Sequence, residues 1–512
     1  MSKEPIAVAI DDNRGGFLKK LEKVGNKIPN PAVLFLFLLV ALAFASWGMN
    51  VMGAQSINPK SHELIYIKSL ISADGLSWFL TTMVKNYVDF PPMGMILVLT
   101  LGLGTASESG FMGTAIRTSI HSIPPRYITF AIVLISFTSH IASDAAIVIV
   151  PPLAAMVFYS LGRHPFVGFA CSVAAIYSGF TANILIVTTD VLLSGITTQA
   201  VRILDPVLTV TPLDNWYFMS FAVIYLSILT TVITEKFVEP RLGPYDPLHA
   251  QDAHIEDIKP EEKKALRAAG FAALAYIAVI LLLTVPEHAL LRNPQDGAIL
   301  GSPFMKGIVP LLCGFLFVIG FAYGKSVGSI KSVDDVIHMM TTAIKGLGGF
   351  MVMAFFIAQF IAAFTWTNMA TFIATSGAEF LQNVGMTGLP ALICFMLFGQ
   401  FMGLFMASGS AIWALLSPVF VPMFMLLGYH PAFIQVAFRA GDGAFNSIAI
   451  VNPWLPLFLE VLRKYKKDAG IGTYLSLMMP YAMAFLVMWY VLFIFWYWMG
   501  WPTGPGVPQR LW

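Results

Sequence analysis

Two short stretches place hydroxyl, imidazole and carboxyl side chains in the middle of long apolar runs. The first, SHIASDAAIVIVPP at 139–152, lies inside the apolar run Tyr127–Gly162. The second, ASGSAIW at 407–413, lies inside the apolar run Leu389–Gly428. Polar groups in such runs either cap a broken helix or take part in a binding site. The two stretches therefore decide how the chain is interpreted.

The polar residues of both stretches suit the start of a helix. Ser143 and Asp144 belong to the first stretch, and Ser408 and Ser410 belong to the second. Small hydroxyl and carboxyl side chains cap free backbone amides, and a helix N-terminus attracts anions. Two interpretations are open: Ser143 and Ser410 either satisfy the backbone of a turn or bind an anionic ligand.

Arg439 and Asp442 are charged residues inside a later apolar segment, three residues apart and so neighbours on a helix. Charges in such segments are rare and mark functional positions by default. One interpretation is a structural ion pair. In the other, the planar guanidinium of Arg439 binds a ligand carboxylate. Asp442 then orients Arg439 or joins Asn446 in an ion site, with Na⁺ as a candidate.

A third charge, Asp190, lies in TANILIVTTDVLLSG at 181–195. It either faces the interior and exchanges a proton or cation, or lies near the outer interface without a functional role. Asn183 adds an oxygen ligand of the hard kind that Na⁺ or a hydroxyl group would use. Trp413, three residues after Ser410, either stacks on an aromatic ligand or marks a membrane interface.

The composition identifies the surroundings of these residues. Of 512 residues, 57% are apolar and 11% are charged, against about 25% charged in soluble domains. The chain is therefore an integral protein of the lipid bilayer, with no nucleic-acid partner. Its three cysteines, Cys171, Cys313 and Cys394, lack metal-ligand spacing. We expect no cofactor and no metal centre apart from a coupling ion, H⁺ or Na⁺.

Apolar segments of spanning length begin near residues 31, 91, 127, 165, 216, 265, 306, 346, 389, 431 and 473. Two are too long for one crossing, because 127–162 has 36 residues and 389–428 has 40, against about 20 needed. Each is either two complete spans or a re-entrant hairpin, and polar midpoints suit a buried hairpin tip. We predict an all-α polytopic membrane protein with nine transmembrane helices plus two opposed re-entrant hairpins.

Basic residues set the orientation of these segments. Four lysines at 19–27 place the N-terminus in the cytoplasm. The charged linker 236–267 and the cluster at 463–467 then fall on the same side. The loops that fall outside carry few basic residues; they are 54–74, 197–214 and 286–305.

The two hairpin segments are related in sequence. Ala142-Ser143-x-x-Ala146-Ile147 matches Ala407-Ser408-x-x-Ala411-Ile412 at an offset of 265, and Leu161-Gly162-x-His164-Pro165 matches Leu427-Gly428-x-His430-Pro431 at an offset of 266. The orientation makes the repeats inverted, as is typical of secondary transporters. The predicted divisions are a cytoplasmic N-terminal segment 1–30, a first repeat 31–239 with hairpin 1 (127–162), a cytoplasmic linker 240–264, a connecting span 265–285, a second repeat 286–499 with hairpin 2 (389–428) and a C-terminal tail 500–512.

Several stretches together carry a resemblance to a known family. They are SHIASDAAIVIVPP, GFTANILIVTTDVLLSGI, DNWYFM, EPRLG, SPFMKGIVPL, ASGSAIW and PVFVPMFMLLGYHPAF. Over nearly its whole length the chain resembles the AbgT family, the p-aminobenzoyl-glutamate transporters. The resemblance implies a homodimer in the bacterial inner membrane. It also implies import of p-aminobenzoyl-glutamate, a folate breakdown product, or export of sulfonamide antimetabolites.

The resemblance implies roles for six positions: Asp190, Ser410, Trp413, Pro431, Arg439 and Asp442. The ligand suits them, since an aryl ring fits Trp413 and glutamate carboxylates fit Arg439. The family also implies a proline eight residues after Asp442, where this chain has Ile450. We therefore predict substrate binding by Ser143, Asn183, Ser410, Trp413, Pro431 and Arg439, and ion coupling by Asp144, Asp190, Asp442 and Asn446.

The function predicted from the sequence is ion-coupled secondary transport of p-aminobenzoyl-glutamate and related aromatic acids, not catalysis. The close alternative is a sodium-coupled dicarboxylate carrier, against which Trp413 argues. An intramembrane aspartyl protease would need Gly-x-Gly-Asp, whereas Asp442 follows Arg-Ala-Gly, and an ATP-driven pump would need a Walker motif that the sequence lacks. The sequence leaves import against export, and H⁺ against Na⁺, open.

Overall fold

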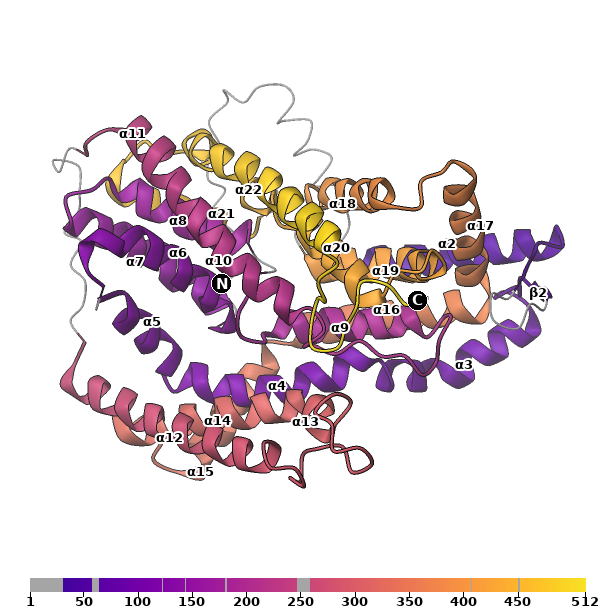
Figure 1. Ribbon diagram of the computed structural model, residues 1–512, viewed down its shortest axis with the longest axis horizontal. Coiled ribbons are helices and arrows are strands. Elements are labelled where there is room, and N and C mark those ends of the chain that lie inside the picture. The colour runs from indigo at the N-terminus through magenta and orange to yellow at the C-terminus, as the bar shows by residue number, and fades with distance from the viewer. Residues whose placement is uncertain are drawn as a thin grey trace, which may run out of the picture.

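Figure 1 shows the computed structural model, which describes residues 31–57, 64–121, 123–142, 144–179, 182–245, 258–406, 408–449 and 452–512. These residues are almost entirely helical, apart from the short antiparallel strands β1 (Gln55–Ile57) and β2 (Leu64–Tyr66). The predicted all-α class is confirmed. The segment 1–30 and the linker residues 246–257 lie outside the described residues, as do Ser143 and Ile450.

The first part of the chain runs to the charged linker. Its elements are α2 (Pro31–Val51), α3 (Ala73–Val88), α4 (Pro91–Glu108), α5 (Phe111–His121), the 3₁₀ turn η1 (Pro125–Tyr127), α6 (Ile128–Thr138), the 3₁₀ turn η2 (Ser139–Ala142), α7 (Asp144–Ser160), α8 (Pro165–Tyr177), α9 (Thr188–Val201), α10 (Trp216–Ile233), the π-helical turn η3 (Thr234–Val238) and α11 (Glu239–Leu242). Hairpin 1 is thus α6 and α7, joined through η2.

The second part repeats this plan after a connecting helix. Its elements are α12 (Pro260–Thr284), α13 (Pro303–Lys306), α14 (Ile308–Val327), α15 (Val333–Lys345), α16 (Gly348–Trp366), α17 (Met369–Asn383), α18 (Leu389–Gly403), α19 (Gly409–Leu426), α20 (Pro431–Asp442), the 3₁₀ turn η5 (Asn446–Ile448), α21 (Leu455–Tyr465) and α22 (Ile471–Met499). Hairpin 2 is α18 and α19, with its tip where α18 ends and α19 begins.

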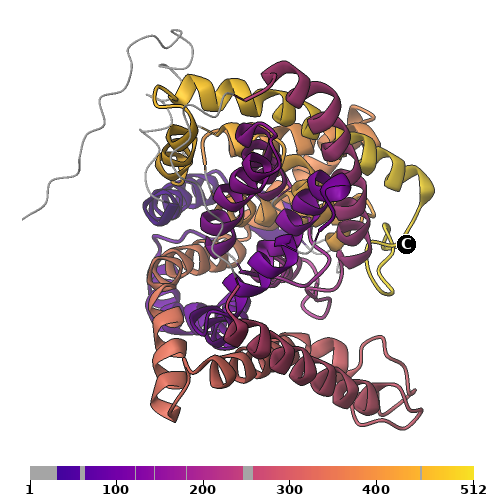
Figure 2. The same ribbon diagram turned by 90° about the vertical axis from the view of Figure 1, so that its left-hand side faces the viewer.

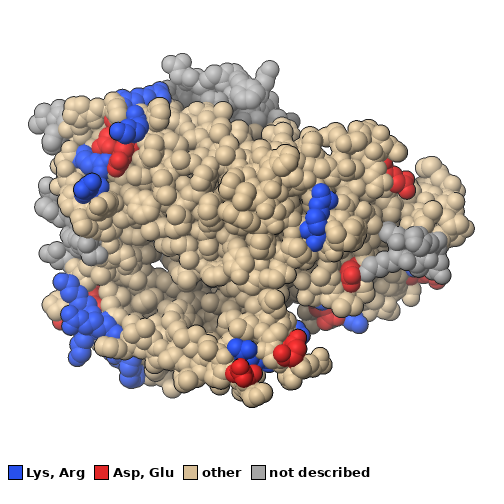
Figure 3. Space-filling view, viewed as in Figure 1, with Lys and Arg blue, Asp and Glu red and all other residues tan. Residues whose placement is uncertain are grey.

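Nine helices among the described residues are long and apolar enough to cross a membrane. Two of them, Pro125–Ala142 and Gly409–Leu426, are halves of the hairpins, and seven match predicted spans. Two predicted spans are broken. The span that begins at 165 is divided into α8 and α9, and the span that begins at 431 is divided into α20 and α21. On the face drawn in Figure 3, Lys and Arg gather toward the left-hand edge and most of the surface is uncharged, as a lipid environment requires.

Helices α3, α15 and α17 were not predicted. Each mixes polar and apolar residues, so none forms a continuous apolar run of spanning length. Figures 1 and 2 show α12, α13, α14 and α15 together at the lower edge, with α4 above them. The two hairpins and the broken helices lie in the rest of the molecule.

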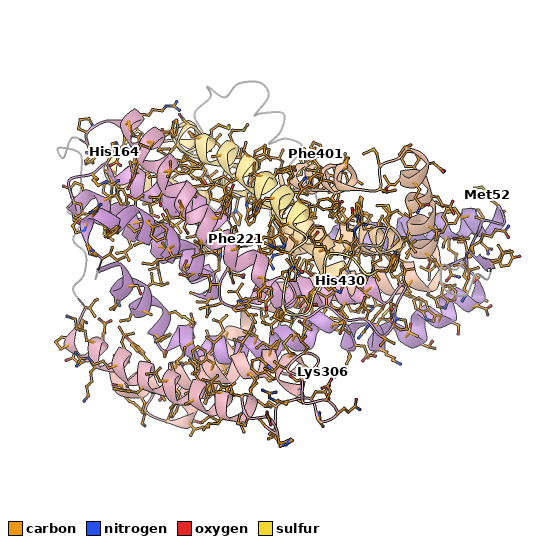
Figure 4. All side chains as sticks on the ribbon, in the orientation of Figure 1. Met52, His164, Phe221, Lys306, Phe401 and His430 are labelled. Atoms are coloured by element: carbon orange, nitrogen blue, oxygen red, sulfur yellow. The ribbon has the colours of Figure 1, made fainter. Side chains whose placement is uncertain are left out.

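The matched residues at the two hairpin bases have matched conformations. Gly162 and Gly428 both have positive φ, 70° and 85°, a region that glycine adopts without strain. Next, His164 and His430 cap α8 and α20, each ring nitrogen Nδ1 accepting a backbone N–H at 3.2 Å. A proline follows each histidine at the first helical position, where it is favoured. The His-Pro pairs therefore start the broken helices, and Figure 4 shows them far apart.

The C-terminal ends of α8 and α20 meet. The Ser178 hydroxyl, just after α8, donates to the carbonyl of Ala444 at 2.9 Å and lies 2.8 Å from the hydroxyl of Ser447. Gln400 of hairpin 2 is oriented with its amide nitrogen toward Gly441. The nitrogen donates to the Gly441 carbonyl at 2.6 Å, and the amide oxygen accepts from the Phe445 N–H at 3.2 Å. Side chains thus satisfy the backbone freed at the break, which is necessary at membrane depth.

Each hairpin base is also fastened to the helix that ends its repeat. At hairpin 1, Arg163 makes a bidentate ion pair with Glu239, its Nε lying 2.7 Å from Oε1. Arg163 also donates to the Thr129 hydroxyl at 2.9 Å and lies over the Phe158 ring. Glu239 begins α11, directly after α10 and its π-helical turn. This contact fixes the end of hairpin 1 against α10.

Hairpin 2 is fastened by the C-terminal tail 500–512. The carbonyl of Gln509 accepts from the backbone N–H of His430 at 2.9 Å. Closer to α22, the carbonyl of Thr503 accepts from the N–H of Tyr217 at 3.0 Å. The tail therefore connects the start of α20 with the start of α10.

Helices α4 and α14 pack through small residues. A Cβ on Gly102 of α4 would lie 2.2 Å from the carbonyl oxygen of Cys313 on α14. One on Gly320 of α14 would lie 2.6 Å from the Cα of Ala106. Such close backbone approach is how membrane helices gain packing where apolar burial gives no advantage over lipid.

Gly102→Ala is expected to lower the thermal unfolding midpoint of the purified protein in detergent. The added methyl group has no room, and overpacking of this kind costs about 1–3 kcal/mol. The matched control is Gly94→Ala on the same helix, where no atom lies within 4 Å of an added Cβ. Equal midpoints for the two variants would contradict the packing described for α4 and α14.

Candidate functional site

A buried ion pair joins the two repeats. Arg439 near the end of α20 places its NH1 2.8 Å from Oδ1 of Asp190 on α9. Their side chains are 0% and 5% exposed, so neither charge is solvated by bulk water. A charge pair buried to this degree needs further hydrogen bonds to offset the loss of hydration.

Asp190 has those further hydrogen bonds. Its Oδ2 accepts from the Asn183 amide at 2.7 Å and from the Val187 backbone N–H at 2.9 Å. Asp190 lies in the first turn of α9, and Arg439 lies in the last turn of α20. Each charge is therefore at the helix end whose dipole favours it.

The structure thus brings together Asn183, Asp190 and Arg439, which the sequence could only propose separately. It also changes the partner of Arg439. The ion pair is with Asp190 of the other repeat, not with Asp442, although Asp442 is a neighbour on α20. Sequence spacing favoured Asp442 because contacts between repeats are invisible to helical periodicity.

Asp442 faces the tip of hairpin 2. A Cβ on Gly403 would lie 3.1 Å from Asp442 Oδ1 and 3.6 Å from Asn446 Oδ1, and one on Gly409 would lie 2.7 Å from Asp442 Oδ2. Asp442 is 1% exposed. The glycines that end α18 and begin α19 therefore let both arms of the hairpin approach one carboxylate. The resulting cluster of oxygen atoms is of the kind that binds hard cations.

The hydroxyl groups of hairpin 2 cap its second helix. Ser408 accepts from the backbone N–H of Ala411 at 3.3 Å, and its hydroxyl lies 3.1 Å from that of Ser410. Ser410 is partly exposed at the start of α19. In this conformation the capping interpretation holds for Ser408, and Ser410 lies in the first turn of α19 beside it.

Trp413 is fully buried. Its ring stacks on Phe438 of α20 with centroids 4.6 Å apart. Its indole N–H donates to the hydroxyl of Thr197 on α9 at 2.9 Å. Trp413 therefore joins α19 to both α20 and α9, the two helices that carry the ion pair.

Other predicted residues lie differently. Pro431 starts α20, eight residues before Arg439, or about 12 Å along the helix. Asp144 begins α7, close in sequence to His140 of η2, whose ring lies within electrostatic range of Arg439. The side chain of Asp144 lies outside the described residues, as does all of Ser143.

Sequence reasoning missed three polar residues close to this site. Gln400 satisfies the backbone at the end of α20, as described above. Thr197 and Gln435 contact each other between α9 and α20. The sequence signal for Thr197 and Gln435 was helical spacing. Thr197 follows Asp190 by seven residues, and Gln435 precedes Arg439 by four. Each therefore shares a helix face with a charged residue.

Broken helices that meet between two hairpins, with a buried ion pair at the meeting point, define a membrane transporter built from two repeats. The chain belongs to the AbgT family: the family described as the AbgT putative transporter family matches residues 16–511.

Three relatives support this membership. The p-aminobenzoyl-glutamate transport protein of Escherichia coli strain K12 is 43% identical over 491 residues, 96% of each chain. The solved structure of the Alcanivorax borkumensis YdaH transporter, described as having an unusual topology, has a TM-score of 0.89 at 34% identity and covers 93% of this chain and 100% of that one. Neisseria gonorrhoeae MtrF, described as illuminating a class of antimetabolite efflux pumps, has a TM-score of 0.91 at 39% identity, with 96% and 100% covered.

Asp190→Asn and Arg439→Gln are each expected to lower the unfolding midpoint in detergent, because each leaves a buried charge without its partner. Breaking such a pair costs about 3–5 kcal/mol. The double variant Asp190→Asn/Arg439→Gln buries no charge at either position, and it should lose less stability than the sum of the two single variants. Additive losses would show that the two charges do not interact.

Asp214, in the loop between α9 and α10, is expected to make stability depend on pH. Burial raises the pKa of this carboxyl to about 6, and the bond from the Thr211 hydroxyl opposes this only in part. Because the folded state favours the protonated acid, the penalty is full above pH 6 and is lost as the pH falls toward 4.

Asp214→Asn removes this titration and keeps an acceptor for Thr211. Relative to that variant, the wild-type unfolding midpoint should rise as the pH falls from 7.5 to 5. The full penalty for a shift of about two pKa units is about 3 kcal/mol, and roughly half of it is relieved between pH 7.5 and 5. A constant difference between the two midpoints across this range would rule out the shift.

Proposed function

We propose that this chain is an ion-coupled secondary transporter that carries p-aminobenzoyl-glutamate, and sulfonamide-like aromatic acids, across the bacterial inner membrane. The observation that carries the proposal is the Asp190–Arg439 pair, a guanidinium buried at the meeting of the two repeats. The name of the Escherichia coli relative supports the aromatic amide of glutamate as substrate. The description of MtrF supports antimetabolites as further substrates.

In this proposal Arg439 binds a carboxylate of the substrate. Its fork can take a bidentate carboxylate, so the substrate competes with Asp190 for the same guanidinium. Asn183, which holds Asp190, and Ser410, at the N-terminus of α19, complete the polar contacts. Ser143 contributes likewise from hairpin 1, and Pro431 fixes the start of α20. The aryl ring meets Trp413 when hairpin 2 moves, since the indole is covered in this conformation.

Competition for Arg439 also provides a coupling mechanism. When a substrate carboxylate takes its place, Asp190 is left as a buried charge, which is unfavourable unless it gains a proton or a cation. Asp442 and Asn446, facing the tip of hairpin 2, form the second candidate site, where Na⁺ would find carboxylate and amide oxygens. Asp144, at the start of α7 in hairpin 1, is a further candidate for ion coupling.

We further propose that the protein works as a homodimer with its N-terminus in the cytoplasm. The positive charge of the segment around residues 19–27 supports this orientation. The protein is proposed to transport its substrate unchanged, without catalysis, as the names of its relatives as transporters suggest.

The test is uptake of labelled p-aminobenzoyl-glutamate by liposomes that contain the purified protein, under a Na⁺ gradient or a pH gradient applied separately. Accumulation is expected under at least one gradient. Accumulation should be lost in Arg439→Gln. If Na⁺ drives transport, Asp442→Asn should no longer respond to the Na⁺ gradient, and if H⁺ drives it, Asp190→Asn should no longer respond to the pH gradient. The control is Asp468→Asn, which removes an 81% exposed carboxylate.

The assay also separates the alternatives. Competition by unlabelled p-aminobenzoyl-glutamate with no competition by succinate or aspartate supports the aromatic substrate. Equal competition by the simple dicarboxylates would support a dicarboxylate carrier instead. No accumulation under either gradient, with folded protein in the liposomes, would refute ion-coupled transport of this substrate.

A further inference from the structure

A chain of hydrogen bonds runs from Trp413 to the start of α20. The indole N–H of Trp413 donates to the hydroxyl of Thr197 at 2.9 Å, and that hydroxyl donates to Oε1 of Gln435. The amide of Gln435 then donates to Oδ1 of Asn215 at 2.7 Å, and the amide of Asn215 donates to the carbonyl of Ala432 at 2.9 Å. The chain links four elements: α19, α9, α20 and the loop before α10.

All the side chains of this chain are buried. Trp413 and Thr197 are 0% exposed, and Gln435 and Asn215 are 2% exposed. A buried donor or acceptor that loses its partner costs about 1–3 kcal/mol. Each member therefore holds its neighbours in place.

The direction of the chain is fixed at one end. An indole N–H can only donate, so the Thr197 hydroxyl must accept from it and direct its own proton elsewhere. A second acceptor for the Thr197 proton is the carbonyl of Leu193 at 2.8 Å, which also belongs to the backbone hydrogen bonds of α9. Donation to Gln435 leaves the Gln435 amide nitrogen free to donate onward. The orientations of both amides follow from the other end of the chain: the Ala432 carbonyl can only accept, so Asn215 donates to it and accepts from Gln435.

The chain lies beside the proposed substrate site. Thr197 follows Asp190 by about two turns on α9, and Gln435 precedes Arg439 by about one turn on α20. The two helices are therefore joined by one charged contact, Asp190 to Arg439, and one neutral contact, Thr197 to Gln435. The neutral contact extends to hairpin 2, through the hydrogen bond between Thr197 and Trp413.

We propose that Thr197 and Gln435 are positioning residues for substrate recognition. They fix the position of Arg439 relative to Trp413. This position sets the distance between the groups that bind the carboxylate and the aryl ring of the substrate. This inference rests on the proposed function, because it assigns Arg439 and Trp413 to the two ends of one ligand. It adds a specificity role to residues that carry no charge and do not touch the ligand.

The test compares Thr197→Val with Thr197→Ser. Valine keeps the branched shape but removes the hydroxyl, whereas serine keeps the hydroxyl. In the liposome assay, Thr197→Val should raise KM for p-aminobenzoyl-glutamate about tenfold and leave the maximal rate within about threefold. Thr197→Ser should stay within about twofold in both. A merely destabilised protein would instead lose maximal rate with KM unchanged.

A spectroscopic measurement needs no substrate. The chain has eleven tryptophans, so fluorine NMR of protein labelled with 5-fluorotryptophan can assign the Trp413 resonance by its loss in Trp413→Phe. That resonance should shift in Thr197→Val and stay in place in Thr197→Ser. Gln435→Met, which cuts the chain on α20, should raise KM about tenfold with the Trp413 resonance unchanged.

Each outcome decides the inference. An unshifted Trp413 resonance in Thr197→Val overturns the hydrogen-bonded chain itself. If the resonance shifts in Thr197→Val but KM keeps its wild-type value in both Thr197→Val and Gln435→Met, the positioning role is overturned. If the wild-type protein moves no p-aminobenzoyl-glutamate, the proposed function fails, and with it the recognition role. The fluorine spectra would then still decide whether the chain exists.

Discussion

The ion pair between Asp190 and Arg439 is the interaction on which the rest of the structure depends. It is buried, it joins the two repeats, and it connects the N-terminal end of α9 to the C-terminal end of α20. Two helices must therefore break close to it, so that their dipoles favour the two charges. Asn183 and the Val187 amide complete the coordination of Asp190. A pair of this kind is weak evidence for stability, and its position favours a functional reason.

The two hairpins are held by contacts with other parts of the chain. Each hairpin base is fastened to a later part of the chain, hairpin 1 through Arg163 and Glu239 and hairpin 2 through the C-terminal tail. Near the tip of hairpin 2, Gly403 and Gly409 lie beside Asp442, and the indole of Trp413 donates to Thr197.

Much of this arrangement could be predicted from the sequence. Long apolar runs gave the hairpins and the spans, including the segments that begin at 165 and 431, whose breaks were not predicted. Asp190, Arg439 and Asp442 stood out because charges in apolar segments are rare. The partner of Arg439 could not be predicted, because contacts between repeats leave no periodic signal. Thr197 and Gln435 were missed since uncharged polar residues inside apolar helices are common, and only their contacts give them a role.

The most direct test of the account is the structure of the protein with p-aminobenzoyl-glutamate bound, determined by electron cryomicroscopy in lipid nanodiscs. The account predicts a glutamate carboxylate of the ligand on the guanidinium of Arg439, with Asp190 displaced from its present distance of 2.8 Å. A ligand bound elsewhere, with the Asp190–Arg439 pair intact, would contradict it.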